Sequence, residues 1–350
     1  MSKPDPGYKH APELTNQNAR LNKLAGVAFG SEVLRKVTNV ILPLNDRGTG
    51  TAFYCVHSIT GSITDFCVMA RMLGAEQKFY GIQAPTKKRN AEFPSSIESI
   101  SRYYVERLIE FQPRGNFVLG GHSVGAMIAF EMAHQLRALA REVSLVVVFD
   151  GELFNTGAEI SAYSPLYWLK LIWNVPAWIR DFLMVEFTFK SFCRTVLNKS
   201  VAACKTIAAK VVGKNSGHAV EGFINLDNFT PDHAAFMKVL FVTQFKYVPR
   251  KYSGRVLICA AKTQALTHLR QLEGPWRKVA PNSQIVHFKG THTSLMHAPE
   301  GFAVAEYLAR QFAEIDAELE SPPISTTKNQ LATHKVRACH QPQDRETDGH

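Results

Sequence analysis

The sequence predicts an α/β fold, in which a mostly parallel central sheet is flanked by helices. Short apolar runs of strand length alternate with longer helix-like segments along most of the chain. One such run, 116–119, passes through a glycine-rich turn at 120–126 into a helix-like stretch at 127–133. A serine in that turn, an acid after the following strand and a histidine after the last strand come in a fixed order. These three observations together predict the fold class.

The turn contains Gly121-His122-Ser123-Val124-Gly125, a Gly-x-Ser-x-Gly pattern between a strand and a helix. In the α/β-hydrolase fold this arrangement is a nucleophile elbow, which lifts the serine clear of the sheet. The small residues at Gly121 and Gly125 allow strand and helix to approach closely. The bare pattern also fits an ordinary glycine-rich turn, but the flanking segments favour the elbow.

Asp150 follows the strand-like run 143–149, and His292 lies in the loop after the strand-like run 284–288. Serine, acid and histidine in this chain order are typical of an α/β-hydrolase catalytic triad. We expect Ser123 to attack a carbonyl, His292 to act as general base, and Asp150 to orient the imidazole.

Other carboxylates are weaker candidates for the acid. The later strand-like run 254–261 is followed by no carboxylate before Glu273, which favours Asp150 on the earlier strand. Glu152 and Asp232 are the alternatives, and Glu152 fits a solvated loop charge better.

Other histidines are weaker candidates for the base. His287 lies within a strand and His297 within the following segment, whereas His292 lies in the loop after a glycine. We interpret His57 and His122 as structural.

An oxyanion hole requires two backbone N–H groups near the serine. One comes from the residue after the nucleophile, Val124. The loop 57–62 after the strand-like run 52–56 supplies the other, and the N–H near Ile59 is the natural donor. The same segment can also be an ordinary loop between a strand and a helix, and the two interpretations are compatible.

Taken together, these residues resemble the thioesterase family that releases products from non-ribosomal peptide and polyketide synthases. The resemblance extends over roughly residues 38–315. It depends on four segments and on two short flanking motifs: 40–45 with 53–57, the elbow with 129–133, Asp150, Gly290-Thr291-His292, Tyr247-Val248-Pro249 and Tyr252-Ser253-Gly254.

The resemblance implies that an acyl chain passes from a phosphopantetheine thioester to Ser123, and then to water or to an internal nucleophile. It implies a carrier protein or synthase as partner, acting in trans, and no metal or redox cofactor. Two departures concern the acyl pocket: the family often has Gly-Gly where this chain has Thr60-Gly61, and glycine where it has Ala126.

Several further elements can be predicted. We expect a helix over 63–73, a strand over 78–82, and a last helix from Glu300 to Ala317. Ser95-Ser96-Ile97-Glu98 has the form of a capping box and opens a helix that ends near Phe111.

The stretch from about 152 to 245 is too long for an ordinary loop and is rich in aromatic residues. We interpret it as a helical lid inserted after the acid-bearing strand, with Trp168, Trp173 and Trp178 as lid residues over the acyl pocket. Additional core and peripheral membrane contact are the alternatives. Breaks at Pro176 and at 180–181 argue against a membrane span.

The predicted organisation is a flexible arm over 1–36, a hydrolase domain over 37–318, and a disordered tail over 319–350. The 350 residues are 45% hydrophobic and 20% charged, which suits one large domain with an insertion. Six cysteines without paired spacing and a polar start of the chain lead us to expect a reducing, cytoplasmic location.

The net charge of +10 is spread along the chain without a dense basic run. It therefore predicts no nucleic-acid site, although a basic surface would suit an acidic carrier protein.

The function that we expect first is that of a serine thioesterase. A carboxylester hydrolase or acyltransferase with the same triad, and a catalytically silent binding module, are the alternatives.

Overall fold

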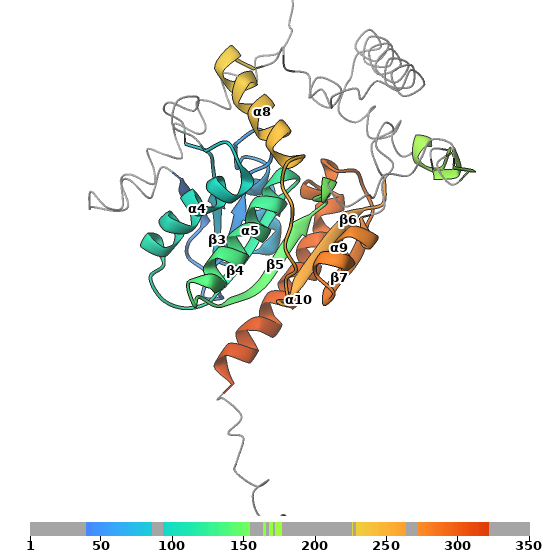
Figure 1. Cartoon of the computed structure of the whole chain (residues 1–350). Helices are drawn as coiled ribbons and strands as arrows, with labels where there is room; N and C mark the ends of the chain where they lie inside the picture. Colours follow the sequence, from blue (N-terminus) through green and yellow to red (C-terminus); the bar gives the residue numbers. More distant parts are fainter. Residues whose placement is uncertain are drawn as a thin grey trace, which may run out of the picture.

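A seven-stranded sheet forms the centre of the protein in a computed structural model (Figure 1). The structure describes residues 40–85, 94–154, 164–165, 168–170, 172–176, 226, 229–263 and 272–321. The strands are β1 (Ile41–Asn45), β2 (Phe53–Val56), β3 (Phe79–Ile82), β4 (Phe117–His122), β5 (Val143–Phe149), β6 (Val256–Ala261) and β7 (Ser283–Phe288).

The strand order is β1-β3-β2-β4-β5-β6-β7. Only the β1–β3 pair is antiparallel, and the other neighbours are parallel. The predicted mostly parallel sheet is therefore confirmed. The chain order reverses at β2, which lies between β3 and β4, and open α/β sheets bind ligands beyond the carboxyl ends of strands at such a point.

Helices cover both faces of the sheet. One face packs against α4 (Ile97–Phe111), α5 (Val124–Ala138), α8 (Pro231–Gln244) and α9 (Glu273–Val279). The other packs against α3 (Phe66–Leu73), the short helix η4 (Ser294–Met296) and α10 (Glu300–Glu320). The fully buried strands alternate between the two layers: Val146 and Val148 of β5 face the first, and Val147 faces the second.

Two predicted helix starts need correction. α3 begins at Phe66 and not at Ile63, because Ser62 and Thr64 hydrogen-bond to each other and hold the preceding residues in turns. α4 is capped by Ser96, whose side chain accepts from the N–H of Ser99, while the Ser99 hydroxyl accepts from the N–H of Ser96. The box is therefore one residue later than the predicted Ser95–Glu98 pair.

Two elements near the C-terminal end also differ from the prediction. α10 continues to Glu320, beyond the predicted end at Ala317, so the first residues of the predicted tail are helical. α9 was not predicted at all, because its seven residues include Gly274 and Pro275, which are poor helix formers.

The predicted lid segment contributes to two regions of the structure. Its last part forms α8, which contacts α5 and buries Phe236, Met237 and Leu240 in the main core. Residues 168–170 and 172–176 are helical, and Trp168 and Trp173 are 54% and 77% exposed. Their lid role stays a prediction. Trp178, the predicted arm and nearly all of the predicted tail lie outside the described residues.

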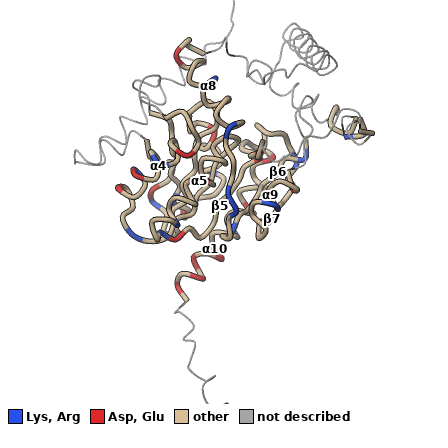
Figure 2. Tube along the Cα trace, in the orientation of Figure 1, with Lys and Arg blue, Asp and Glu red and all other residues tan. Residues whose placement is uncertain are grey.

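Charged residues are distributed along the described trace, with acidic residues gathered toward the end of α10 (Figure 2). Among the described helices, none combines the length and the apolar character that crossing a membrane requires. Within the same residues, no group of three or more His, Cys, Asp or Glu side chains is arranged to hold a metal ion.

Candidate active site

Ser123 lies at a sharp turn between β4 and α5. Its backbone has φ 58° and ψ −123°, a conformation that is strained for a residue with a side chain. The Ser123 N–H donates to the carbonyl of Phe149, and the Ser123 carbonyl accepts from Ala126, each at 3.0–3.1 Å. These bonds hold the strained turn. Within the described residues the Ser123 hydroxyl makes no hydrogen bond, so it is available to a reacting group.

The glycines of the motif are required by close backbone contacts. A Cβ on Gly121 would lie 2.1 Å from the carbonyl oxygen of Gly125. A Cβ on Gly125 would lie 2.2 Å from the carbonyl oxygen of His57 and 2.5 Å from that of Val56. The elbow therefore packs directly against the end of β2 and the loop that follows it.

Asp150 immediately follows β5 and also has a positive φ, 48°. Its N–H donates to the carbonyl of Cys259, and its Oδ1 accepts from the N–H of Ala261 at 2.8 Å. The other carboxylate oxygen, Oδ2, accepts from Nδ1 of His292 at 2.8 Å. The carboxylate is thus fixed by β6 on one side and directed at the imidazole on the other.

The Asp150–His292 pair joins residues that are 142 positions apart in the chain. The side chain of Asp150 is 15% exposed and that of His292 is 40% exposed. Donation from Nδ1 to the carboxylate leaves Nε2 of a neutral His292 as the free base nitrogen. This is the tautomer that a general base for a serine requires.

His122, the residue before Ser123, holds the histidine loop. Its Nε2 donates to the backbone carbonyl of His292 at 2.8 Å, and the two imidazole rings lie 4.6 Å apart. Burial, reinforced by the nearby His292, lowers the pKa of His122 to about 3, so the ring is neutral. Its Nδ1 is buried without a hydrogen-bond partner in the described structure.

The two predicted oxyanion donors lie beside the elbow. Val124 is the first residue of α5, where N–H groups have no partner inside the helix and the helix dipole is positive. Ile59 is in the loop after β2, against which Gly125 packs. Among the described residues, neither N–H donates in a turn or loop hydrogen bond. Both groups are therefore available to an oxygen atom bound near Ser123.

Of the alternative candidates, His122 bonds to the backbone of His292, whereas Asp232, His287 and His57 have other positions or partners among the described residues. Glu152 lies beyond Asp150 in the chain, and Asp232 is an exposed residue at the start of α8. His287 faces Glu273 at 3.8 Å on the surface. His57 is fully buried, and its ring lies between the carbonyl of Ser58 and the hydroxyl of Tyr104.

One residue that supports the candidate site was not predicted from the sequence. Trp276 of α9 is fully buried, and its indole N–H donates to the carbonyl of Gly151 at 2.9 Å. It therefore fixes the chain just after Asp150. This role could hardly be predicted from the sequence, because Trp276 lies in a segment without clear helical periodicity.

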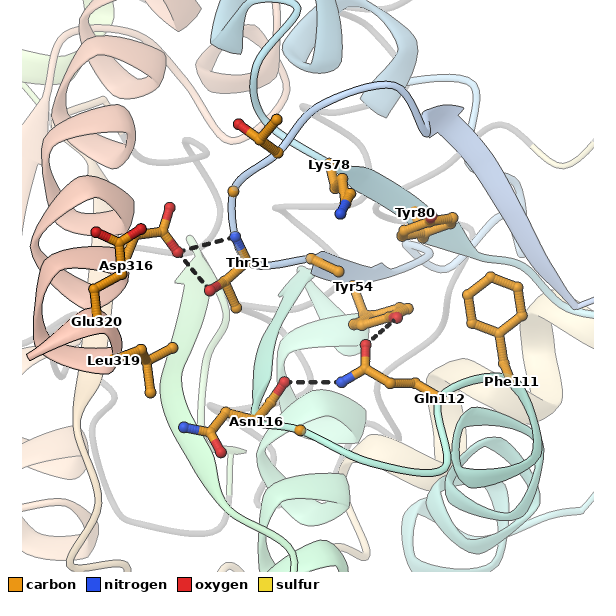
Figure 3. A pocket seen from close by; sticks show the side chains of 14 residues that line it. Thr51, Tyr54, Lys78, Tyr80, Phe111, Gln112, Asn116, Asp316, Leu319 and Glu320 are labelled. Carbon is orange, nitrogen blue, oxygen red and sulfur yellow. Dashed lines mark hydrogen bonds between the residues drawn. The ribbon is translucent and has the colours of Figure 1, made fainter. Parts of the chain in front are cut away.

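A separate hollow of about 600 Å³ lies at the other end of the sheet (Figure 3). It is lined by residues that precede β2, β3 and β4 and by the end of α10. Thr51 there donates through its N–H and hydroxyl to Asp316, and the hydroxyl of Tyr54 donates to Gln112. Since Ser123, Asp150 and His292 follow their strands, this hollow is not part of the candidate active site.

Residues 51–159 match the family model of the thioesterase domain. Enterobactin synthase component F of Escherichia coli is 30% identical over 156 residues, and malpinin synthetase of Mortierella alpina is 31% identical over 112. The comparisons confirm the resemblance to the thioesterase family. These matches cover 41% and 32% of this chain but 12% and 1% of the relatives' lengths, respectively.

Solved thioesterase structures share the fold over a longer stretch. The NocB thioesterase domain from the nocardicin cluster superposes with a TM-score of 0.52 at 19% identity, and the match covers 78% of this chain and 99% of that domain. A four-domain nonribosomal peptide synthetase gives 0.53 at 20% identity, over 78% of this chain and 20% of the synthetase. The chain therefore has the α/β-hydrolase fold, as predicted. His292 lies outside the stretch matched by the family model, so only the structure joins it to Asp150.

Proposed function

We propose that the protein is a serine thioesterase that releases acyl, peptidyl or polyketide chains held as thioesters on the phosphopantetheine arm of a carrier protein. The observation that carries the proposal is the hydrogen-bonded Asp150–His292 pair next to the strained turn at Ser123. The sequence relatives named as synthases and the structural likeness to thioesterase domains support the same class of reaction.

In the first half of the reaction, the Ser123 hydroxyl attacks the thioester carbonyl and passes its proton to Nε2 of His292. The N–H groups of Val124 and Ile59 stabilise the negative charge on the carbonyl oxygen. The C–S bond then breaks, and His292 returns the proton to the departing sulfur. The products of this half are an acyl ester on Ser123 and a free thiol.

In the second half, water or a hydroxyl or amine of the acyl chain attacks the ester, and His292 again takes and returns one proton. Hydrolysis gives a free acid, and internal attack gives a ring. Asp150 stabilises the imidazolium in both halves. These steps need neither a metal nor a redox cofactor. The substrate is presented by a carrier protein that acts in trans.

The test is the mass of the intact protein after mixing with short acyl-pantetheine thioesters, together with Ser123→Ala. We expect an acyl adduct and thiol release in the wild type, and neither in the variant, which should keep the wild-type melting temperature. A fluorophosphonate, the reagent class seen bound covalently to the NocB thioesterase domain, reports serine reactivity without a carrier.

Each outcome decides between the candidates. Turnover of acyl-pantetheine or acyl-carrier substrates supports the thioesterase. Turnover restricted to simple esters or CoA thioesters would identify the carboxylester hydrolase or acyltransferase. A wild-type protein that reacts with neither the thioesters nor the fluorophosphonate would be a silent module, and the proposal would be wrong.

A further inference from the structure

α8, the last helix of the long insertion, contacts the loop that carries Ile59. Nε2 of His233 lies 2.7 Å from the carbonyl oxygen of Thr60, although the two residues are 173 positions apart. A carbonyl oxygen can only accept, so His233 donates from Nε2. The ring is held by its neighbours Phe229 and Phe236, whose ring centroids lie at 5.0 and 6.3 Å. A side chain of the insertion is thus bonded to the residue next to Ile59.

A second contact fixes the loop one residue further along. Gly61 has φ +72°, and its N–H closes a turn onto the carbonyl of Ser58. A Cβ on Gly61 would lie 2.9 Å from the ring of Phe236 and 2.9 Å from Ala84. Phe236 is buried and therefore packs directly against the loop backbone.

The loop is also braced from within by Thr60, at the position where the chain departs from the glycine pair of the family it resembles. The Thr60 hydroxyl lies 3.2 Å from that of Ser58 and accepts from the N–H of Ser62 at 3.3 Å. The side chain of Thr60 bonds to the loop, and its carbonyl bonds to His233. The peptide unit that carries the Ile59 N–H is therefore held through the Ser58 carbonyl, and the Thr60–Gly61 unit is held through its carbonyl and its N–H.

α8 also lies against α5, the helix that begins with the other proposed oxyanion donor. It contacts α5, and Phe236 and Met237 belong to the same buried cluster as Val124 and Ala126. One helix thus contacts α5 and, through His233 and Phe236, the loop of Ile59. The two backbone N–H groups must both point at one oxygen atom to within fractions of an ångström. A helix that contacts the elements carrying both groups can therefore affect the rate of the reaction.

We infer that His233 is a positioning residue, which holds the Ile59 loop in the geometry of a working oxyanion hole through its hydrogen bond to Thr60. The inference rests on the proposed function. It also assigns a task to the insertion that differs from covering the substrate, since α8 supports the loop that carries Ile59.

The test compares three variants of the full-length protein. His233→Phe keeps a ring between Phe229 and Phe236 but removes the donor, and His233→Gln restores an N–H donor on a side chain of similar reach. Val239→Ala alters an exposed residue of the same helix and is the matched control. For each protein we would measure kcat and KM with an acyl-pantetheine thioester and the melting temperature.

Two inhibitors isolate the oxyanion hole. A trifluoromethyl ketone forms a tetrahedral adduct with an oxyanion, whereas a non-hydrolysable thioether analogue binds only as a ground state. We expect His233→Phe to lower kcat roughly tenfold or more and to weaken the ketone by a similar factor, with KM and thioether binding unchanged. His233→Gln should recover most of the loss, and Val239→Ala should match the wild type.

The outcomes separate this inference from the proposed function. If the wild type fails to react with the ketone and the thioesters, the proposed function is wrong. If the wild type reacts and His233→Phe matches it, the positioning role is wrong. A loss in His233→Phe that weakens both inhibitors equally, or that only follows a lower melting temperature, would also overturn the inference.

Discussion

Asp150 has three defined partners, and this makes its role testable by a change of one atom. Its two carboxylate oxygens accept from Ala261 and from His292, while its N–H is bonded to Cys259. An amide at this position has the same shape, but its NH₂ group can donate to the imidazole nitrogen that now donates to the carboxylate. The histidine would then be held in the wrong tautomer.

We therefore predict that Asp150→Asn lowers kcat by about 10³- to 10⁴-fold while leaving the fold intact. Steady-state kinetics with a thioester substrate, together with a melting curve, measures both properties. Glu152→Gln is the matched control, because Glu152 is the neighbouring carboxylate, and it should retain wild-type kcat. A large loss in Glu152→Gln with normal turnover in Asp150→Asn would move the acid to Glu152.

At the scale of a single element, the start of α4 shows which residue caps a helix. The side chains of Ser96 and Ser99 each accept a hydrogen bond from the other's backbone N–H, and so they satisfy two donors at the helix start. Ser95, the residue expected to form the cap, contributes its carbonyl, which accepts from Thr243 of α8. That bond does not depend on the Ser95 side chain.

We predict that Ser96→Ala lowers the free energy of unfolding by about 1 kcal/mol, because it removes the cap. Ser95→Ala should cost much less, since the carbonyl that it uses is kept. Urea unfolding of the two variants beside the wild type gives the comparison. Equal losses in both variants, or a larger loss in Ser95→Ala, would contradict the assignment of the cap.

This pair also shows what the sequence could and could not specify about elements. Ser95, Ser96 and Ser99 offer two overlapping registers for a cap, and the sequence pattern favoured the one with a glutamate at its third position. In the structure the Ser99 hydroxyl takes the acceptor role that a glutamate at the third helical position would take, so the local pattern does not separate the two registers. The inner strands β2, β4 and β6 were easier to predict, since their apolar runs are buried on both faces and leave little ambiguity.

At the scale of the whole molecule, the candidate site joins residues that lie far apart in the sequence. The order of serine, acid and histidine could be predicted because each follows a strand of a parallel sheet, and such ends meet at one edge. The contacts of Trp276 with Gly151 and of His233 with Thr60 could not be predicted. They depend on how α9 and α8 fold back over the sheet, and no local pattern encodes that path.

The stability of the whole molecule should depend on pH through His122. The folded protein holds this ring neutral with a pKa of about 3, whereas an unfolded chain binds a proton near the ordinary value of 6.5. Below pH 6.5 the unfolded state therefore binds more protons, and stability falls as the pH falls toward 3. The stabilisation is fully present above pH 6.5.

We predict that His122→Gln removes this part of the pH dependence. Each pH unit between 6.5 and 3 corresponds to about 1.4 kcal/mol for one such group, so wild type and variant should differ by about 2–3 kcal/mol more at pH 4.5 than at pH 7.5, in favour of the variant. Urea unfolding at the two pH values measures the difference, with His287→Gln as the control for loss of an exposed imidazole. Parallel stability curves for wild type and His122→Gln would show that His122 is not held neutral by burial. Because His122 also bonds to the carbonyl of His292, the same variant changes the support of the loop that carries His292.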